Sequence, residues 1–260
     1  MVKRLLAVIA LAACTAAPAA EYVMLPGGRF ESVLPQGSSP TASTPVDVKP
    51  FAMRTTPVTA GEFARFVATH PEWQRGRAAK VMADARYLSK WATPLQPGAS
   101  VPAQSPVTDV SWFAAGAFCE AEGGRLPTWL EWEYAAAADA TRADARRDPA
   151  WQRKILSWYE QTTPAILPAV GGAPNAYGVR DLHGAVWEWV DDFNALFIAG
   201  DSRTQGDPDK LKFCGAGALN IIDRDSYAVL MRIALLSSLS GADTTGTLGF
   251  RCVRDLESTP

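Results

Sequence analysis

The spacing of apolar residues predicts a helix over residues 59–70, in the stretch "TAGEFARFVATH". Thr59 precedes Glu62 by three residues, which is the capping-box pattern at a helix start. Phe63, Phe66 and Val67 then fall on one face of the predicted helix. A buried helix that packs through two phenylalanines is expected here.

Two more helices are predicted downstream. The stretch "DVSWFAAGAFCEAEGG" (residues 109–124) has an apolar face, a capping serine at Ser111 and a Gly-Gly pair at its end. The stretch "RLPTWLEWEYAAAA" repeats the capping box, with Thr128 as N-cap and Glu131 three residues later. Both helices therefore have sequence-defined starts.

The remaining pattern is short and irregular. Residues 22–31 alternate around a Gly-Gly turn, which predicts a β-hairpin, and residues 45–59 predict further strand. Residues 71–105 indicate a long surface loop, and residues 139–174 indicate irregular structure. The runs "YAVLMRIALL" and "GTLGFRCVRD" look strand-like. Without an internal repeat or a Pro/Gly/Ser-rich linker, the chain is expected to form one loop-rich α+β domain.

Composition excludes some classes of function. The chain has 260 residues, 48% of them hydrophobic, and a formal net charge of -2. This balance gives no electrostatic footprint for nucleic acid and no polybasic segment for a membrane surface. Nine tryptophans are many for this length, which indicates large aromatic packing or a binding groove.

The N-terminus has the pattern of an export signal. Lys3 and Arg4 precede an apolar run of nine residues, Leu5 to Ala13, and small residues follow up to residue 20. The run is shorter than the roughly 20 residues of a membrane-spanning helix, and no longer apolar run follows it. "LAAC" resembles a lipobox that would leave a lipidated Cys14, whereas "APA" before Ala20 resembles an ordinary cleavage site. The small-residue stretch favours simple cleavage, with residues 1–20 as signal peptide, residues 21–257 as the domain, and a periplasmic or secreted product.

Three cysteines remain after the signal: Cys119, Cys214 and Cys252. In an oxidising compartment two of the three should pair, and their spacing leaves all three pairings open. The chain contains no CxxC motif and only two histidines, so a zinc site of the Cys/His type is not expected.

Several of these stretches together resemble one family. "PVTDVSWFAAGAFCEAEGGRLPTWLEWEYAA", "NAYGVRDLHGAVWEW" and the terminal "LGFRC" occur in the order and spacing of the formylglycine-generating (sulfatase-modifying factor) family. The resemblance spans nearly all of residues 21–257. It implies an irregular single domain related to the C-type lectin fold, a calcium ion and, in catalytic members, copper-dependent oxidation of a substrate cysteine to formylglycine.

The resemblance implies a calcium-binding turn over residues 181–188, at the Trp187-Glu188-Trp189 motif. Asp181 and Glu188 would supply carboxylate oxygens, and Gly184 and Val186 backbone carbonyls. Calcium prefers six to eight oxygen ligands of these kinds. The alternative is that Asp181 forms a turn and Glu188 pairs with an arginine. In the calcium-binding turn, Trp187 and Trp189 would face the core and hold Glu188 in place.

The resemblance also implies a disulfide between Cys119 and Cys252, which leaves Cys214 as a reactive thiol or as a buried small apolar residue. Catalytic members bind copper through two cysteines ahead of the terminal "GFR", but this chain has no cysteine between Cys214 and Cys252. Copper(I) prefers soft thiolate ligands. Neither copper binding nor formylglycine-generating activity is therefore expected.

Three functions remain under this resemblance. The first is a non-catalytic accessory protein that binds a polypeptide or a periplasmic enzyme in the family's groove; the "CGAGAL…LGFRC" pattern also looks like members encoded beside copper nitrite reductases, which links it to denitrification. The second is an enzyme of altered oxidative chemistry. The third is a lectin-like ligand-binding module, which exposed aromatic residues near the calcium turn would support. The candidate groove residues, which the second function would use, are Asp223, Arg224, Asp225 and Tyr227, in the segment that replaces the copper ligands. The alternative is that this segment is a solvated turn.

Overall fold

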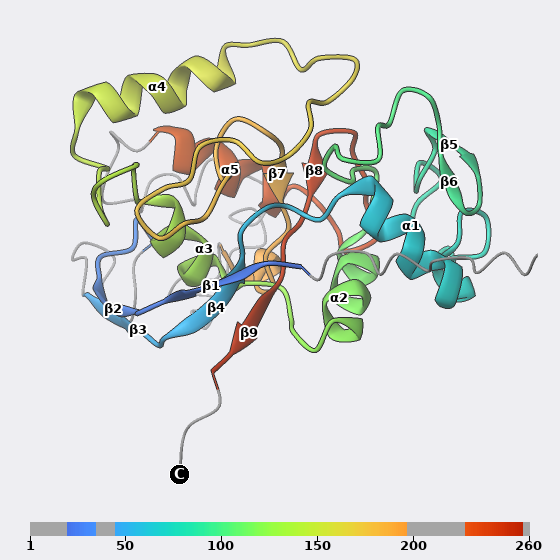
Figure 1. Ribbon diagram of the computed structural model, residues 1–260, viewed down its shortest axis with the longest axis horizontal. Helices are drawn as coiled ribbons and strands as arrows, with labels where there is room; N and C mark the ends of the chain where they lie inside the picture. The colour runs from blue at the N-terminus through green and yellow to red at the C-terminus, as the bar shows by residue number, and fades with distance from the viewer. Residues whose placement is uncertain (1–19, 35–44, 197–226, 257–260) are drawn as a thin grey trace, which may run out of the picture.

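A three-stranded antiparallel sheet joins the two ends of the described chain. Strand β4 (Phe51–Arg54) lies between β1 (Tyr22–Leu25) and β9 (Val253–Asp255), as Figure 1 shows. Met53 pairs with Val23 on one side and with Val253 on the other. The buried positions Leu25, Phe51, Met53 and Val253 turn apolar side chains toward the core.

This computed structural model describes residues 20–34, 45–196 and 227–256. Three further strand pairs are two or three residues long: β2–β3 and β5–β6 are antiparallel, and β7–β8 is parallel. The elements not yet located are β2 (Gly28–Phe30), β3 (Val46–Val48), α1 (Ala60–Thr69), η1 (Pro71–Trp73), β5 (Trp91–Thr93), β6 (Gln96–Pro97), α2 (Trp112–Ala121), α3 (Trp129–Ala136), α4 (Pro149–Tyr159), β7 (Trp187–Glu188), η2 (Phe193–Ala195), α5 (Tyr227–Ser237) and β8 (Leu248–Gly249).

All three predicted helices are confirmed. Thr59 and Glu62 form the capping box of α1, and Thr128 and Glu131 form that of α3. The Ser111 side chain accepts a hydrogen bond from the Ala114 amide at the start of α2. These caps are local interactions, so the sequence alone defines where the helices begin.

The hairpin predicted over residues 22–31 is wrong. Strand β1 pairs with β4, and β2 pairs with β3, so the Gly-Gly turn separates two strands that belong to different sheets. Gly27 has a φ of +66°, and a Cβ at this position would lie 2.2 Å from the Val48 carbonyl oxygen. The glycine is needed for this close backbone approach rather than for a hairpin turn.

Two helices appear where the sequence analysis predicted none. Helix α4 lies within the segment expected to be irregular, and it starts with Asp148 as N-cap and Pro149 in the first turn. The run "YAVLMRIALL" forms α5 instead of a strand. Val229, Ile233 and Leu236 are buried on one face of α5, at helical spacing that a short apolar run obscures.

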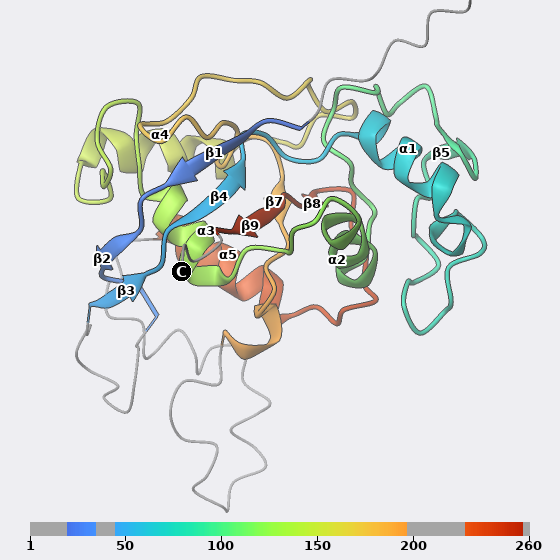
Figure 2. The same cartoon turned by 60° about the horizontal axis from the view of Figure 1, so that its bottom comes forward.

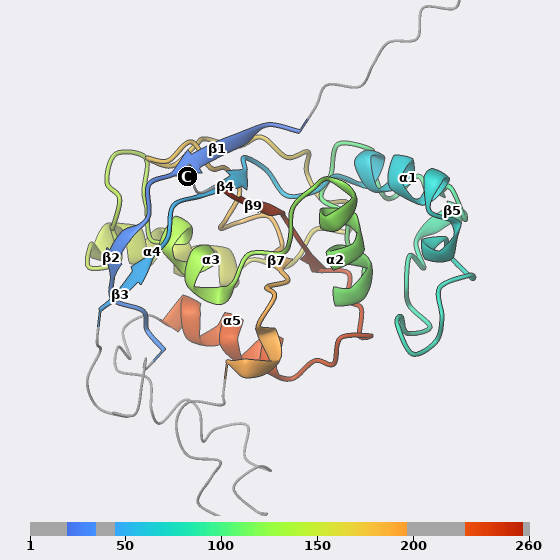
Figure 3. The same cartoon turned by 90° about the horizontal axis from the view of Figure 1, so that it is seen from below.

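The helices enclose the core from different sides. Figure 3 shows α3 between the three-stranded sheet and α5, and Figures 1 and 2 show α1 with β5 and β6 at one end of the molecule. Phe63 of α1 contacts the rings of Phe118 and Phe250 at centroid distances of 5.9 and 6.1 Å. Among the described residues, no helix has the length and apolar character needed to cross a membrane.

The expected class is confirmed: one mixed α+β domain with few helices, short strands and long loops, consistent with the C-type lectin-like fold. Short strands leave much of the backbone in loops, so side-chain hydrogen bonds and large aromatic residues hold these loops in place.

Candidate binding site at the Trp-Glu-Trp turn

The turn that carries the Trp-Glu-Trp motif runs into β7, which pairs in parallel with β8 at Glu188 and Gly249. Asp181 and Gly184 both adopt positive φ values, +59° and +94°. Asp181 therefore occupies the left-handed region, which aspartate tolerates better than most residues. The parallel pairing places Glu188 next to the strand that leads into Arg251.

Glu188 is fully buried and forms an ion pair with Arg251, which is also fully buried. Arg251 Nε donates to Glu188 Oε2 and Arg251 Nη2 donates to Oε1, each at 2.8 Å. Trp132 Nε1 donates to the same Oε2 at 2.9 Å. Glu188 is thus neutralised by an arginine, which is the alternative that the sequence analysis left open.

The carboxylate of Asp181 also has hydrogen-bond partners. Its Oδ2 accepts the amide hydrogen of Gly171 at 2.7 Å, and its Oδ1 accepts that of Gly172 at 3.0 Å. The side chains of Asp181 and Glu188 therefore hold a loop and a guanidinium in this arrangement, and they do not fit a calcium ion as they stand. Among the described residues, no three His, Cys, Asp or Glu side chains gather into a possible metal site. The resemblance implies calcium coordination by these residues with Gly184 and Val186, and chelation tests that expectation against this arrangement.

A second buried arginine, which the sequence analysis did not identify, contacts the same turn. Arg232 of α5 lies over the Trp132 ring with 3.5 Å between Cζ and the ring centroid, and its Nη2 donates to the Glu188 carbonyl oxygen. Its Nε has no hydrogen-bond partner among the described residues. Burial lowers the pKa of Arg232 to about 10, although the Glu188 carboxylate acts in the opposite direction. The available signal was one arginine within an otherwise apolar run.

His183 completes the surroundings of Trp132. Its Nε2 lies 2.9 Å from the Ala136 carbonyl oxygen, so the neutral ring donates from this nitrogen. Its ring packs edge-on against Trp132 and Trp151. Burial lowers the pKa of His183 to about 4.

The two tryptophans of the motif have different surroundings. Trp189 is fully buried and donates from Nε1 to the Val110 carbonyl oxygen at 3.0 Å, as expected of a core residue. Trp187 is half-buried and packs against Trp158 and Tyr159, at centroid distances of 5.4 and 5.1 Å. Both tryptophans pack against the core, and α4 brings two further aromatic rings to the part of Trp187 that the core leaves uncovered.

These rings line one of two neighbouring cavities. The aromatic cavity, of about 220 Å³, is bounded by Trp158, Tyr159 and Trp187 and by the turn at Gly184. The second cavity, of about 350 Å³, is bounded by Lys90, by several hydroxyl groups and by apolar residues such as Val101 and Pro102; it is called the polar cavity because it contains the lysine. The walls common to both cavities are Thr163, Pro164, Leu167 and Thr247.

The loop around Leu167, which forms part of the common wall, is held in place by hydrogen bonds. Ser105 Oγ donates to the Leu167 carbonyl oxygen at 2.6 Å, and the Val170 amide donates to the Gln104 carbonyl oxygen at 2.9 Å. Two cavities with a hydrogen-bonded common wall therefore lie next to the Trp-Glu-Trp turn.

Three of the four predicted groove residues lie outside the described residues: Asp223, Arg224 and Asp225. Tyr227 is the first residue of α5. Cys14 and Cys214 also lie outside the described residues.

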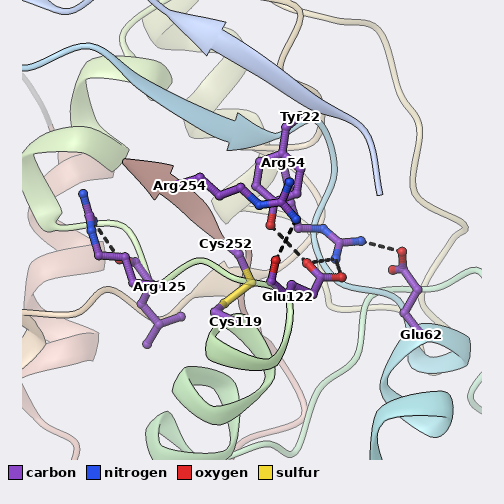
Figure 4. The surroundings of a disulfide bond; sticks show 9 residues. Tyr22, Arg54, Glu62, Cys119, Glu122, Arg125, Cys252 and Arg254 are labelled. Carbon is purple, nitrogen blue, oxygen red and sulfur yellow. Dashed lines mark hydrogen bonds and ion pairs between the residues drawn. A yellow bond between two sulfur atoms is a disulfide. The ribbon is translucent and has the colours of Figure 1, made fainter. Parts of the chain in front are cut away.

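Cys119 and Cys252 form a disulfide that connects α2 to the segment preceding β9, with 5.4 Å between the Cα atoms. Figure 4 shows the ion pairs around it. Arg54, itself buried, contacts Glu62 at 2.5 Å and Glu122 at 2.7 Å. This network ties β4 to α1 and to the end of α2, so the disulfide lies within a tightly connected region.

The family described as "Sulfatase-modifying factor enzyme 1-like domain" matches residues 10–256. The chain is 28% identical to the formylglycine-generating enzyme of Streptomyces coelicolor, over 91% of this chain and 90% of that protein. It is also 28% identical to inactive C-alpha-formylglycine-generating enzyme 2 of Bos taurus, over 88% and 86%. The solved structure of PvdO from Pseudomonas aeruginosa aligns over 90% of this chain and 94% of that chain, with a TM-score of 0.49 and 21% identity.

Proposed function

The chain belongs to the sulfatase-modifying factor enzyme 1-like family, and we propose that it is an exported, non-catalytic member that binds a polypeptide segment of a partner protein. The observation that carries this proposal is the pair of neighbouring cavities beside the Trp-Glu-Trp turn. The partner would be a periplasmic or secreted protein, and a role beside a copper nitrite reductase stays a prediction from the sequence.

The lack of a thiolate pair supports a non-catalytic role. Cys119 and Cys252 are buried in a disulfide. Cys214 is then the one remaining cysteine of the expected mature chain. A two-thiolate copper site cannot be built from one thiol. Similarity alone does not decide this point, because the chain matches both a formylglycine-generating enzyme and a relative named as inactive.

The cavities favour a peptide over a sugar. The aromatic cavity offers flat rings, two prolines and Gln161, but no side-chain carboxylate among its described lining. In the polar cavity, the nearby carboxylate of Asp109 is buried and paired with Lys90. Gln161 is the one side-chain amide in this described lining that can bond a sugar hydroxyl, whereas aromatic and proline-rich walls suit peptide side chains.

The two other functions remain alternatives. An enzyme of altered oxidative chemistry would depend on residues 223–225, which lie outside the described part of the chain, and on Tyr227 at the start of α5. The lectin-like module gains support from the half-buried aromatic rings beside the turn, since such rings stack on the flat faces of sugars. The glycan arm of the test addresses the lectin-like module.

The test is a binding screen of the purified protein against a heptapeptide library and a glycan array. We expect peptides with an aromatic residue or proline to bind, and Trp158→Leu to weaken that binding. The matched control is Trp73→Leu, which removes another half-buried tryptophan that lines neither cavity. Binding of glycans alone would favour the lectin-like module, and peptide binding that Trp158→Leu leaves intact would place the site elsewhere.

A further inference from the structure

Lys90 is the one charged side chain in the described lining of the two cavities. Its side chain is 45% exposed, and its Nζ lies 3.6 Å from Oδ2 of Asp109, which is 8% exposed. The cation is therefore open to solvent, while its counter-ion lies behind it. A ligand that enters the polar cavity meets the ammonium group and not the carboxylate.

Neighbouring backbone fixes the position of this ammonium group. A Cβ at Gly246 would lie 2.6 Å from Lys90 Nζ, so the lysine head occupies the space that this glycine leaves open. Asp109 holds the other side, and it has a φ of +56° and a buried environment. A lysine ammonium has three donors. Asp109 engages one side of the group, so the others can serve a ligand.

The two cavities have complementary chemistry. One presents a positioned cation among hydroxyl groups, and the other presents Trp158, Tyr159 and Trp187. Side chains i and i+2 of an extended peptide point to the same side, roughly 7 Å apart. Two cavities with a common wall can receive such a pair from one segment.

We infer that the two cavities together bind an extended polypeptide segment in which an acidic side chain lies two residues from an aromatic one. This inference rests on the proposed function and specifies which polypeptide sequences the site prefers. The acidic group pairs with Lys90 in the polar cavity, and the aromatic ring packs against Trp158 and Trp187. A charge-assisted hydrogen bond to Lys90 distinguishes carboxylate from amide.

The experiment compares two pools of heptapeptides by fluorescence anisotropy. Each pool has a fixed tryptophan and, two residues before or after it, either aspartate or asparagine. We expect the aspartate pool to bind about tenfold more tightly, which corresponds to ~1.4 kcal/mol. Lys90→Gln should abolish this preference and Lys90→Arg should retain it. Lys80→Gln removes an exposed lysine that lines neither cavity, and it should change nothing.

Variants of Asp109 test the same pair from the other side. Asp109→Asn should increase the preference for aspartate, because Lys90 then has no competing carboxylate; asparagine tolerates the positive φ. The double variant Lys90→Gln/Asp109→Asn removes the pair without leaving a buried charge, so its lack of preference is not due to misfolding. Circular dichroism checks the fold of each variant.

The binding results distinguish failure of the acidic selectivity from failure of the proposed function. Equal binding of both pools, weakened by Trp158→Leu, overturns the acidic selectivity and leaves the proposed function standing. Binding of neither pool overturns both. A preference for aspartate that survives Lys90→Gln overturns the assignment of Lys90.

Discussion

Arg251 and Glu188 form a two-point ion pair in the centre of the molecule, with both N–O distances at 2.8 Å and neither side chain exposed. The two residues lie 63 positions apart in the sequence. Arg251 also donates to the carbonyl oxygen of Arg180 at 2.9 Å. The pair therefore joins the last strand region to the turn that carries the Trp-Glu-Trp motif.

Breaking this pair should destabilise the fold strongly. Arg251→Leu should lower the free energy of unfolding by about 3 to 5 kcal/mol, because it leaves a buried carboxylate without a counter-ion. Urea denaturation measures this change. Arg153→Leu, at an exposed position of α4, should change it by less than about 0.5 kcal/mol. The double variant Glu188→Leu/Arg251→Leu should cost less than the sum of the single variants; full additivity would contradict the pairing.

The Arg251–Glu188 ion pair also affects whether calcium can bind at this turn. The sequence resemblance predicts an ion held by Asp181 and Glu188, and a bound ion would make the Tm fall on chelation. In the described arrangement, Arg251 already neutralises Glu188. We therefore expect EDTA to leave the Tm unchanged and metal analysis to find no stoichiometric calcium. A Tm that falls on chelation, and no longer responds in Glu188→Ala, would instead establish calcium at this turn.

The disulfide should link Cys119 to Cys252 and leave Cys214 as a thiol. It closes a loop with a sequence separation of 133 residues. Chain entropy then gives about 4 to 5 kcal/mol of stabilisation. Peptide mapping without reduction identifies the linked pair, and Cys119→Ala/Cys252→Ala should lower the Tm. Since both cysteines are fully buried, reductant should act slowly before unfolding. A link that includes Cys214 would contradict the pairing.

A sulfatase-motif peptide should remain unmodified after aerobic incubation with the protein and copper(I). The reaction needs copper to activate oxygen, and the single thiol of Cys214 provides no thiolate pair for it. Mass spectrometry detects the loss of mass that marks an aldehyde. A catalytic family member serves as positive control and copper alone as blank. Turnover above that blank would show that catalysis does not need the pair.

His183 should make the protein lose stability in mild acid. Its pKa is about 4 in the folded chain and about 6.5 when unfolded, because burial disfavours the charged ring. Between these values the unfolded chain binds more protons, so the free energy of unfolding falls as pH decreases from about 6.5 to about 4. Urea titrations of wild type and His183→Gln at several pH values isolate this contribution. Parallel curves would exclude it.

Some elements could be predicted from sequence because their causes are local. Thr59 with Glu62, and Thr128 with Glu131, satisfy helix ends within one turn of chain, so both helix starts appear where the sequence places them. The start of α4 was equally local, since Asp148 and Pro149 are a cap and a first-turn residue. It could have been predicted, but the apolar pattern that follows is weak. Helix α5 could not, because its short apolar run, interrupted by Arg232, fits a strand as well as a helix.

The sequence by itself determined the family, the α+β class and the capped helices. Only the tertiary structure decided that Glu188 pairs with Arg251, that Arg232 reaches the same turn from α5, and that Trp187 borders a cavity while it packs against the core. The reason is physical: a buried charge takes the partner that folding brings within hydrogen-bond distance. That partner can lie anywhere along the chain, and residue spacing contains no record of it.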